Sequence, residues 1–125
     1  MVLLSKLVNF QVYSNQLTGT IPSFIGQMSS LSYLFLFNNL LNGKDFFVFL
    51  AIIFFLGTIP SVLGQLTKLN QLMLHTNKFT GTIPTSIGDL SSLSLLYLMG
   101  NLLTGIIFST MHMVYFLRKD SDLGW

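Results

Sequence analysis

The sequence contains no cysteine and very little charge. The absence of Cys among 125 residues excludes disulfide frameworks and thiolate metal sites. Charged residues make up only 8% of the chain, Glu does not occur, and 51% of the residues are apolar. This balance excludes an intrinsically disordered chain, because enough apolar side chains are present to build a core. The length suits one domain.

The few positive charges are dispersed. The net charge is +2, and the cations stand apart along the chain except for the neighbours Arg118 and Lys119. A nucleic-acid-binding surface requires basic residues clustered on one face or along one helix. We therefore expect no nucleic-acid partner.

Motifs that carry catalysis or cofactor binding are also missing. Gly43-Lys44 is not followed by Ser or Thr, so it does not form a phosphate-binding loop. The sequence has no Gly-x-Ser-x-Gly elbow and no kinase signature. His75 and His112 lack partners at the spacing of metal ligands. We therefore expect a protein that is not an enzyme and uses no cofactor or metal.

The dominant feature of the sequence is a repeat. Four segments follow the pattern Leu-x-x-Leu-x-Leu-x-x-Asn-x-Leu-x-Gly, with Phe10, Val12 and Phe79 at three of the Leu positions. Their asparagines are Asn15, Asn39, Asn77 and Asn101. The first and last intervals between these asparagines are 24 residues, whereas the middle interval is 38 residues, or 24 + 14. The sequence therefore predicts about four 24-residue repeats, one of which carries an insertion of 14 residues.

Each repeat predicts a short strand followed by a turn. Alternate side chains of the Leu-x-x-Leu-x-Leu segment face inward, so stacked repeats form a parallel sheet over a continuous apolar column. The asparagine amide can satisfy backbone groups of adjoining coils, and the glycine permits a sharp turn. The predicted fold is an α/β solenoid, with a curved parallel β-sheet on the concave face and an irregular or 3-10 convex side.

These repeats resemble the plant-specific class of leucine-rich repeat. The resemblance rests on Leu-Thr-Gly-Thr-Ile-Pro at 17–22, Gly-Thr-Ile-Pro at 57–60 and Phe-Thr-Gly-Thr-Ile-Pro at 79–84. It implies a fragment of the ectodomain of a receptor-like kinase or receptor-like protein. Such ectodomains bind a protein or peptide ligand, or a co-receptor, in development or defence signalling.

The repeat pattern also predicts the domain organisation. Residues 1–107 are expected to form the solenoid, interrupted by an apolar insertion at about 44–57, and residues 108–125 form a non-repeat C-terminal tail. The first repeat begins at its second half, and the polar caps that terminate solenoids are missing. We therefore expect a fragment or a truncated gene product.

The insertion contains an uninterrupted apolar run at 46–56. Its length falls short of the roughly 20 residues that a membrane-spanning helix needs. Its aromatic and β-branched residues suit a strand or an aggregation-prone edge. An alternative is intron sequence read in frame, because the flanking Gly43 and Gly57 look like one interrupted glycine.

The concave face is the candidate binding surface. Its variable positions point away from the core and are rich in Tyr, Phe and Met, and aromatic anchors dominate interface energetics. Alternatively, these side chains contact only one another or the insertion. Protonation of His75 would make binding pH-sensitive if its ring contacts the partner. The alternative, which we favour, is a solvated histidine. The candidate partner-binding residues are Gln11, Tyr13, Tyr33, Phe35, Phe37, Gln71, Met73, His75, Tyr97 and Met99, with Asn9 and Leu95 at the remaining variable positions.

The sequence therefore predicts a non-catalytic protein- or peptide-binding module. The resemblance implies a plasma-membrane, cell-surface or apoplastic location, although no signal peptide or full transmembrane segment stands in this chain. Membrane association is expected only through a parent protein, or weakly through the apolar segments. Two alternatives remain: a soluble apoplastic inhibitor resembling polygalacturonase-inhibiting proteins, and a truncated gene remnant with no independent role.

Overall fold

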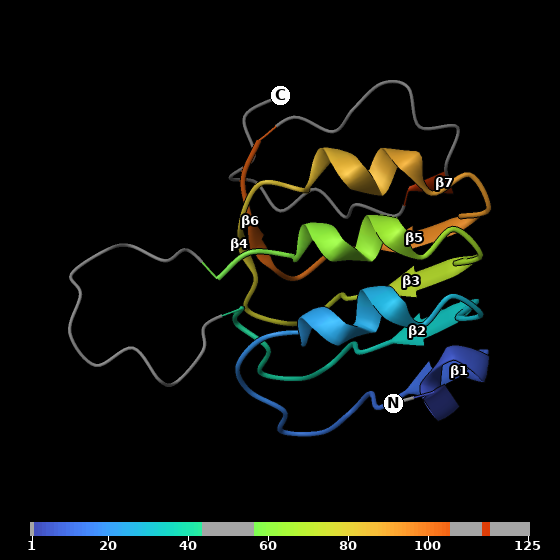
Figure 1. The fold of residues 1–125 in the computed structure, drawn as a ribbon. Coiled ribbons are helices and arrows are strands. Elements are labelled where there is room, and N and C mark those ends of the chain that lie inside the picture. The colour runs from blue at the N-terminus through green and yellow to red at the C-terminus, as the bar shows by residue number, and fades with distance from the viewer. Residues whose placement is uncertain (1, 44–56, 106–113, 116–125) are drawn as a thin grey trace, which may run out of the picture.

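A computed structural model describes residues 2–43, 57–105 and 114–115. Within these residues the chain forms coils that stack along one direction, and each coil adds one strand to a common parallel sheet (Figure 1). The strand order is β1-β2-β3-β5-β7. These strands are β1 (Asn9–Gln11), β2 (Tyr33–Phe35), β3 (Gln71–Met73), β5 (Leu95–Tyr97) and β7 (Val114–Tyr115). The predicted solenoid with a parallel sheet is confirmed.

Short 3-10 helices lie opposite the sheet in each coil, as the sequence predicts. They are η1 (Val2–Lys6), η2 (Ser23–Gln27), η3 (Ser61–Gln65) and η4 (Thr85–Asp89). Proline precedes η2, η3 and η4, with φ values of −62°, −69° and −59°. Proline favours this extended entry because its ring holds φ near these values and it has no N–H to donate. The three helices stack side by side in Figure 1.

Two strands lie outside the predicted pattern. β4 (Thr80–Gly81) and β6 (Leu102–Leu103) form a second, two-stranded parallel sheet beside the glycine turns. β7 pairs in parallel with β5, although it lies within the segment that the sequence analysis assigned to a non-repeat tail. The main sheet thus extends past the last recognisable repeat.

The strand register is the same on both sides of the insertion. Tyr33 pairs with Gln71 across 38 residues, just as Gln71 pairs with Leu95 across 24. The sheet therefore absorbs none of the 14 additional residues. These residues fall between β2 and β3 in the sequence, and residues 44–56 lie outside the described part of the chain.

Gly43 and Gly57 together fill one repeat position. Gly43 has φ +67°, close to the +71° of Gly81 at the same position in the next coil. The repeat carbonyl, however, comes from Gly57, which accepts a hydrogen bond from the N–H of Thr80 at 2.8 Å. The backbones of Gly43 and Gly57 lie close together. A Cβ atom on Gly43 would overlap the backbone of Gly57 and Thr58, and a Cβ atom on Gly57 would overlap the backbone of Asn42. The coil therefore closes as though these two glycines were a single residue.

The core is one apolar column that runs through the coils. The same repeat positions contribute to it in each coil, and the side chains interlock between neighbouring coils. Its most buried members are Leu31, Leu34, Leu63, Leu66, Leu69, Leu72, Leu74, Phe79 and Ile87. Leu7, Phe10 and Val12 of the first coil are only partly buried against this core.

The repeated asparagine ties each coil to the coil before it. Asn77 donates from Nδ2 to the carbonyl of Leu36 at 3.0 Å, and its Oδ1 accepts from the N–H of Leu41 at 3.1 Å. Asn39 and Asn101 make the equivalent pairs of bonds. Asn15 instead donates to Val12 and Tyr13 of its own coil. The predicted role of the asparagine between coils is therefore confirmed from the second coil onward.

Candidate binding surface

The fold brings the predicted binding residues together in three rows across the sheet. The first two rows are set by the strand register and comprise Asn9, Tyr33, Gln71 and Leu95, then Gln11, Phe35, Met73 and Tyr97. The third row lies just beyond the strands and comprises Tyr13, Phe37, His75 and Met99. Backbone bonds continue the ladder there: Ser14 N–H donates to Phe37 O at 3.0 Å, and Thr76 N–H donates to Met99 O at 2.8 Å.

Four rings form a continuous column over successive coils, which we call the ring column: Tyr13, Phe37, His75 and Tyr97. Tyr13 and Phe37 stack with centroids 4.5 Å apart and planes 4° from parallel. Phe37 and His75 stack at 4.4 Å and 13°. Tyr97 meets His75 edge-on at 5.9 Å. Equal repeat positions place the first three rings in line, whereas Tyr97 belongs to the neighbouring row.

A second set of ring contacts links the rows along β2. Tyr33 lies edge-on to Phe35 at 6.3 Å, and Phe35 lies tilted against Phe37 at 6.5 Å. The edge-on contact of Tyr33 with Phe35 is one that aromatic quadrupoles favour. The rings of the second coil are therefore held by one another as well as by the column.

Stacking determines which parts of the rings remain available. Both faces of Phe37 are covered, by Tyr13 and by His75, so its ring presents mainly an edge. Tyr13 is 44% exposed, and the other candidate aromatic residues are half-buried. None of the variable positions carries a charged residue. The surface thus offers ring edges, thioethers, phenol hydroxyls and amides, with no fixed charge.

A row of residues with positive φ borders the third row. Ser14, Asn38 and Thr76 have φ values of 55°, 53° and 54°, and Gly100 has 65° at the same repeat position. Thr76 is β-branched, so this conformation is strained. Its hydroxyl lies 3.2 Å from Nδ1 of His75. The strained turn therefore holds the hydroxyl that orients the imidazole in the column.

His75 is the one titratable group with a clear shift among the described side chains. Partial burial in the column lowers the pKa of its imidazole below the ordinary value, because desolvation disfavours the charged form. The lowered pKa therefore favours the neutral ring at pH 7. A neutral ring stacks on Phe37 without introducing charge into the surface.

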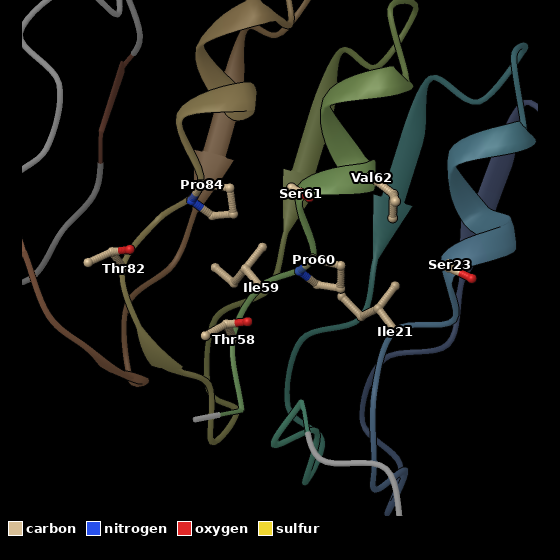
Figure 2. A pocket seen from close by; sticks show the side chains of 9 residues that line it. All are labelled: Ile21, Ser23, Thr58, Ile59, Pro60, Ser61, Val62, Thr82 and Pro84. Carbon is tan, nitrogen blue, oxygen red and sulfur yellow. The ribbon is translucent and has the colours of Figure 1, made fainter. Parts of the chain in front are cut away.

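A separate groove of about 460 Å³ lies where the chain enters the 3-10 helices (Figure 2). Successive coils contribute the same Thr-Ile-Pro segment to it, so it has a repeated and uncharged lining. Sequence reasoning did not select this surface, although the recurring Ile-Pro pairs mark it. Its lining residues are Ile21, Ser23, Thr58, Ile59, Pro60, Ser61, Val62, Thr82 and Pro84.

Two further observations concern sites of other kinds. Across residues 2–43, 57–105 and 114–115, no group of three or more His, Cys, Asp or Glu side chains could hold a metal ion. No helix in this described part of the chain has the length and apolar character needed to cross a membrane.

The stacked strands, the asparagine ties and the proline-led 3-10 helices define the class of protein: the chain is a leucine-rich-repeat solenoid. Residues 68–90 match the family model described as Leucine Rich Repeat. No curated protein sequence matches the chain.

More narrowly, the coils are similar to those of plant receptor ectodomains. The plant peptide hormone receptor RGFR1, in complex with RGF2, is 37% identical with a TM-score of 0.71, over 85% of this chain and 15% of that one. The BIR3–SERK2 complex from Arabidopsis thaliana is 33% identical with a TM-score of 0.66, over 81% and 47%. A plant ice-binding protein is 32% identical with a TM-score of 0.70, over 86% and 30%. The chain thus spans less than half the length of these proteins.

Proposed function

We propose that the chain is a non-catalytic recognition module that binds an apolar, uncharged segment of a protein or peptide along its concave face. The observation that carries this proposal is the ring column, set in a surface without charged residues. An unpaired charge on a ligand would lose its hydration there without gaining a partner. The surface therefore selects against charged ligands.

The side chains of the ring column are already fixed in place before a ligand binds, and this favours binding. Tyr13, Phe37 and His75 are already held by mutual stacking, so little side-chain freedom remains to be lost when a ligand docks. Ring edges carry partial positive charge and attract the backbone carbonyls of an extended peptide. The half-buried thioethers of Met73 and Met99 add adaptable apolar contacts.

The similar proteins support a peptide or co-receptor as the partner class. The solved structures include RGFR1 in complex with RGF2, HAESA in complex with a peptide hormone ligand, and BIR3 in complex with SERK2. Similarity to a plant ice-binding protein means that the solenoid alone does not define a ligand, so we infer the ligand class from the chemistry of the surface. By the same relationship we propose a cell-surface or apoplastic location.

Panning a displayed random-peptide library on the immobilised full chain tests the proposal. We expect enrichment of uncharged, apolar peptides, and we expect Phe37→Ala to weaken their binding at least about tenfold, as for a central aromatic anchor. Phe24→Ala is the matched control, because Phe24 is 44% exposed on η2, outside the concave face. Enrichment of charged peptides, or equal losses from the two variants, would contradict the proposal.

The same experiment separates the alternatives. A receptor-derived module should retain short peptides that saturate one site. A soluble inhibitor would instead recognise a folded enzyme surface and should retain no short peptide, although it would capture the enzyme. A remnant without an independent role should enrich no sequence above the background of the support.

A further inference from the structure

Thr76 combines a strained backbone with a hydroxyl directed at the ring column. Its φ of 54° lies in the left-handed region, which a β-branched residue enters only at an energetic cost. The next coil has Gly100 at the same repeat position, with φ 65°, and a glycine adopts this conformation without that cost. The turn itself therefore requires no side chain, so the strain at Thr76 accompanies a contact that only its side chain makes.

That contact is with the imidazole of His75. The hydroxyl oxygen of Thr76 lies 3.2 Å from Nδ1 of His75. A hydroxyl can donate or accept a hydrogen bond, whereas a neutral imidazole carries its proton on one nitrogen only. An imidazole nitrogen is a much stronger base than a hydroxyl oxygen, so the bond is stronger when Thr76 donates and Nδ1 accepts. Because the bond at one ring nitrogen decides where the proton sits, this contact favours the tautomer with the proton on Nε2.

Stacking leaves Nε2 at the open edge of the imidazole ring. Phe37 covers one face, with planes 13° from parallel and centroids 4.4 Å apart. Tyr97 belongs to the next coil, on the other side of the ring from Phe37, and meets the ring at 5.9 Å. Nε2 lies on the side of the ring away from the backbone and forms no hydrogen bond with any group that the structure describes. An acceptor that approaches in the plane of the ring can therefore reach Nε2 from the concave side.

We propose that Thr76 is a positioning residue whose hydroxyl holds the proton of His75 on Nε2, and that Nε2–H donates to a backbone carbonyl of the bound peptide. This inference rests on the proposed function and specifies one of its contacts. An apolar peptide still carries a carbonyl at every residue, and each carbonyl that loses water on docking needs a donor. Phenyl rings and thioethers supply no such donor, whereas the imidazole stands among them and does.

Long-range proton–nitrogen correlation spectra of the ¹⁵N-labelled full chain at about pH 8, where imidazole is neutral, test the tautomer without a ligand. The signals that disappear in His75→Gln are those of His75. We expect the pattern of a protonated Nε2 and an unprotonated, hydrogen-bonded Nδ1. Thr76→Val removes the hydroxyl but keeps the β-branched shape, and it should move the Nδ1 resonance; Thr76→Ser should leave the resonance in place. A proton on Nδ1, or an unchanged Nδ1 resonance in Thr76→Val, would overturn the proposal.

A peptide enriched by panning on the full chain then measures the contact with the ligand. Thr76→Val and His75→Phe should each weaken its binding about three- to tenfold, the loss expected for one hydrogen bond. His75→Phe retains a stacking ring but has no donor, so adding Thr76→Val to it should cause no further loss if Thr76 acts through His75. Losses that multiply in the double variant would show that Thr76 acts independently of His75 and would refute the proposal.

Thr76→Gly separates positioning from stability. Glycine relieves the positive φ, as at Gly100, so this variant should melt at no lower temperature than the unmodified chain. It lacks the hydroxyl, however, and should show the same change in the Nδ1 resonance and the same loss of affinity as Thr76→Val. A Thr76→Gly variant that keeps both the resonance and the affinity would contradict the proposal.

The two measurements also keep the two proposals apart. Panning that enriches no peptide would refute the proposed function and, with it, the donation to a ligand. The spectra need no ligand and would still show whether Thr76 holds the proton on Nε2. If a peptide is enriched but the spectra place the proton on Nδ1, the proposed function stands and the role of Thr76 falls.

Discussion

The first coil and the inner coils carry the same repeat pattern in different surroundings. Leu17 and Leu41 occupy one repeat position, yet Leu17 is 42% exposed and Leu41 is 4% exposed. The side-chain amide of Asn15 donates to carbonyls of its own coil, whereas that of Asn77 also bonds to the coil before it. The pattern thus determines where a side chain points, and the neighbouring coil determines what that side chain contributes to stability.

The largest expected difference lies in the core. Leu41→Ala should lower the free energy of unfolding by about 3 kcal/mol, through lost apolar burial and the cavity left behind. Leu17→Ala should cost about 1 kcal/mol, because its side chain is already half in solvent. Urea denaturation of the two variants measures both values. Equal losses would show that the first coil is as well packed in solution as the second.

Replacing the asparagines should also cost more stability in the inner coils than in the first coil, with a smaller difference than for the leucines. Asn77→Ala leaves the N–H of Leu41 buried without its partner and removes one of the two bonds to the carbonyl of Leu36, which keeps its bond from Asn39, at a cost of about 1–3 kcal/mol. Asn15→Ala removes two exposed bonds and should cost less than about 1 kcal/mol. Thermal melts of the two variants measure the losses. A lower melting temperature for Asn15→Ala than for Asn77→Ala would contradict this expectation.

Deleting residues 44–57 tests whether the insertion belongs to the inner solenoid. We expect the deletion to change the free energy of unfolding by no more than about 1 kcal/mol, because Gly43 then supplies both the turn and the carbonyl to Thr80. Denaturant unfolding monitored by circular dichroism gives the value.

Two deletions of different length serve as controls for register. Deleting residues 44–56 leaves both glycines in the coil, and deleting residues 43–57 leaves neither. Each should be less stable than the deletion of residues 44–57, because the coil then has one residue too many or too few. If all three variants melt alike, Gly43 and Gly57 do not share a repeat position in solution.

The smallest expected effect concerns His75. Burial lowers the pKa of its folded-state imidazole, so the unfolded chain binds more protons at mildly acidic pH. The neutral ring's contribution is therefore present above about pH 6.5 and is lost as the pH falls below that value. His75→Phe should remove this dependence while preserving stacking on Phe37. Melts of the unmodified chain and of His75→Phe between about pH 8 and pH 5 measure this dependence. An equal loss of stability in both would contradict the expectation.

Much of the fold could be predicted because the same residue types recur at the same spacing in each repeat. The spacing of Leu31, Leu34 and Leu36 predicts an inward-facing strand, and Asn39 and Gly43 mark the turns that follow. The candidate residues of the binding surface follow from the same alternation. Their gathering in three rows was predictable, because equal repeat positions align across a parallel sheet.

Other features depend on contacts that no single repeat encodes. The face-to-face stacking of Phe37 between Tyr13 and His75 depends on side-chain torsions in three coils. β7 could not be predicted, because the sequence around it shows no repeat spacing and its pairing comes from β5. The exposure of Leu4 and Val8 depends on what covers the first coil, which no pattern within that coil records.

The shared position of Gly43 and Gly57 also has a consequence for covalent modification. Joining Gly43 directly to Thr58 would create the sequence Asn-Gly-Thr starting at Asn42. In a secreted protein this sequence is an acceptor for an N-linked glycan. In the intact chain Lys44 stands two residues after Asn42, so no such acceptor exists there. Fourteen residues that leave the coil geometry unchanged therefore decide whether this turn can carry a sugar.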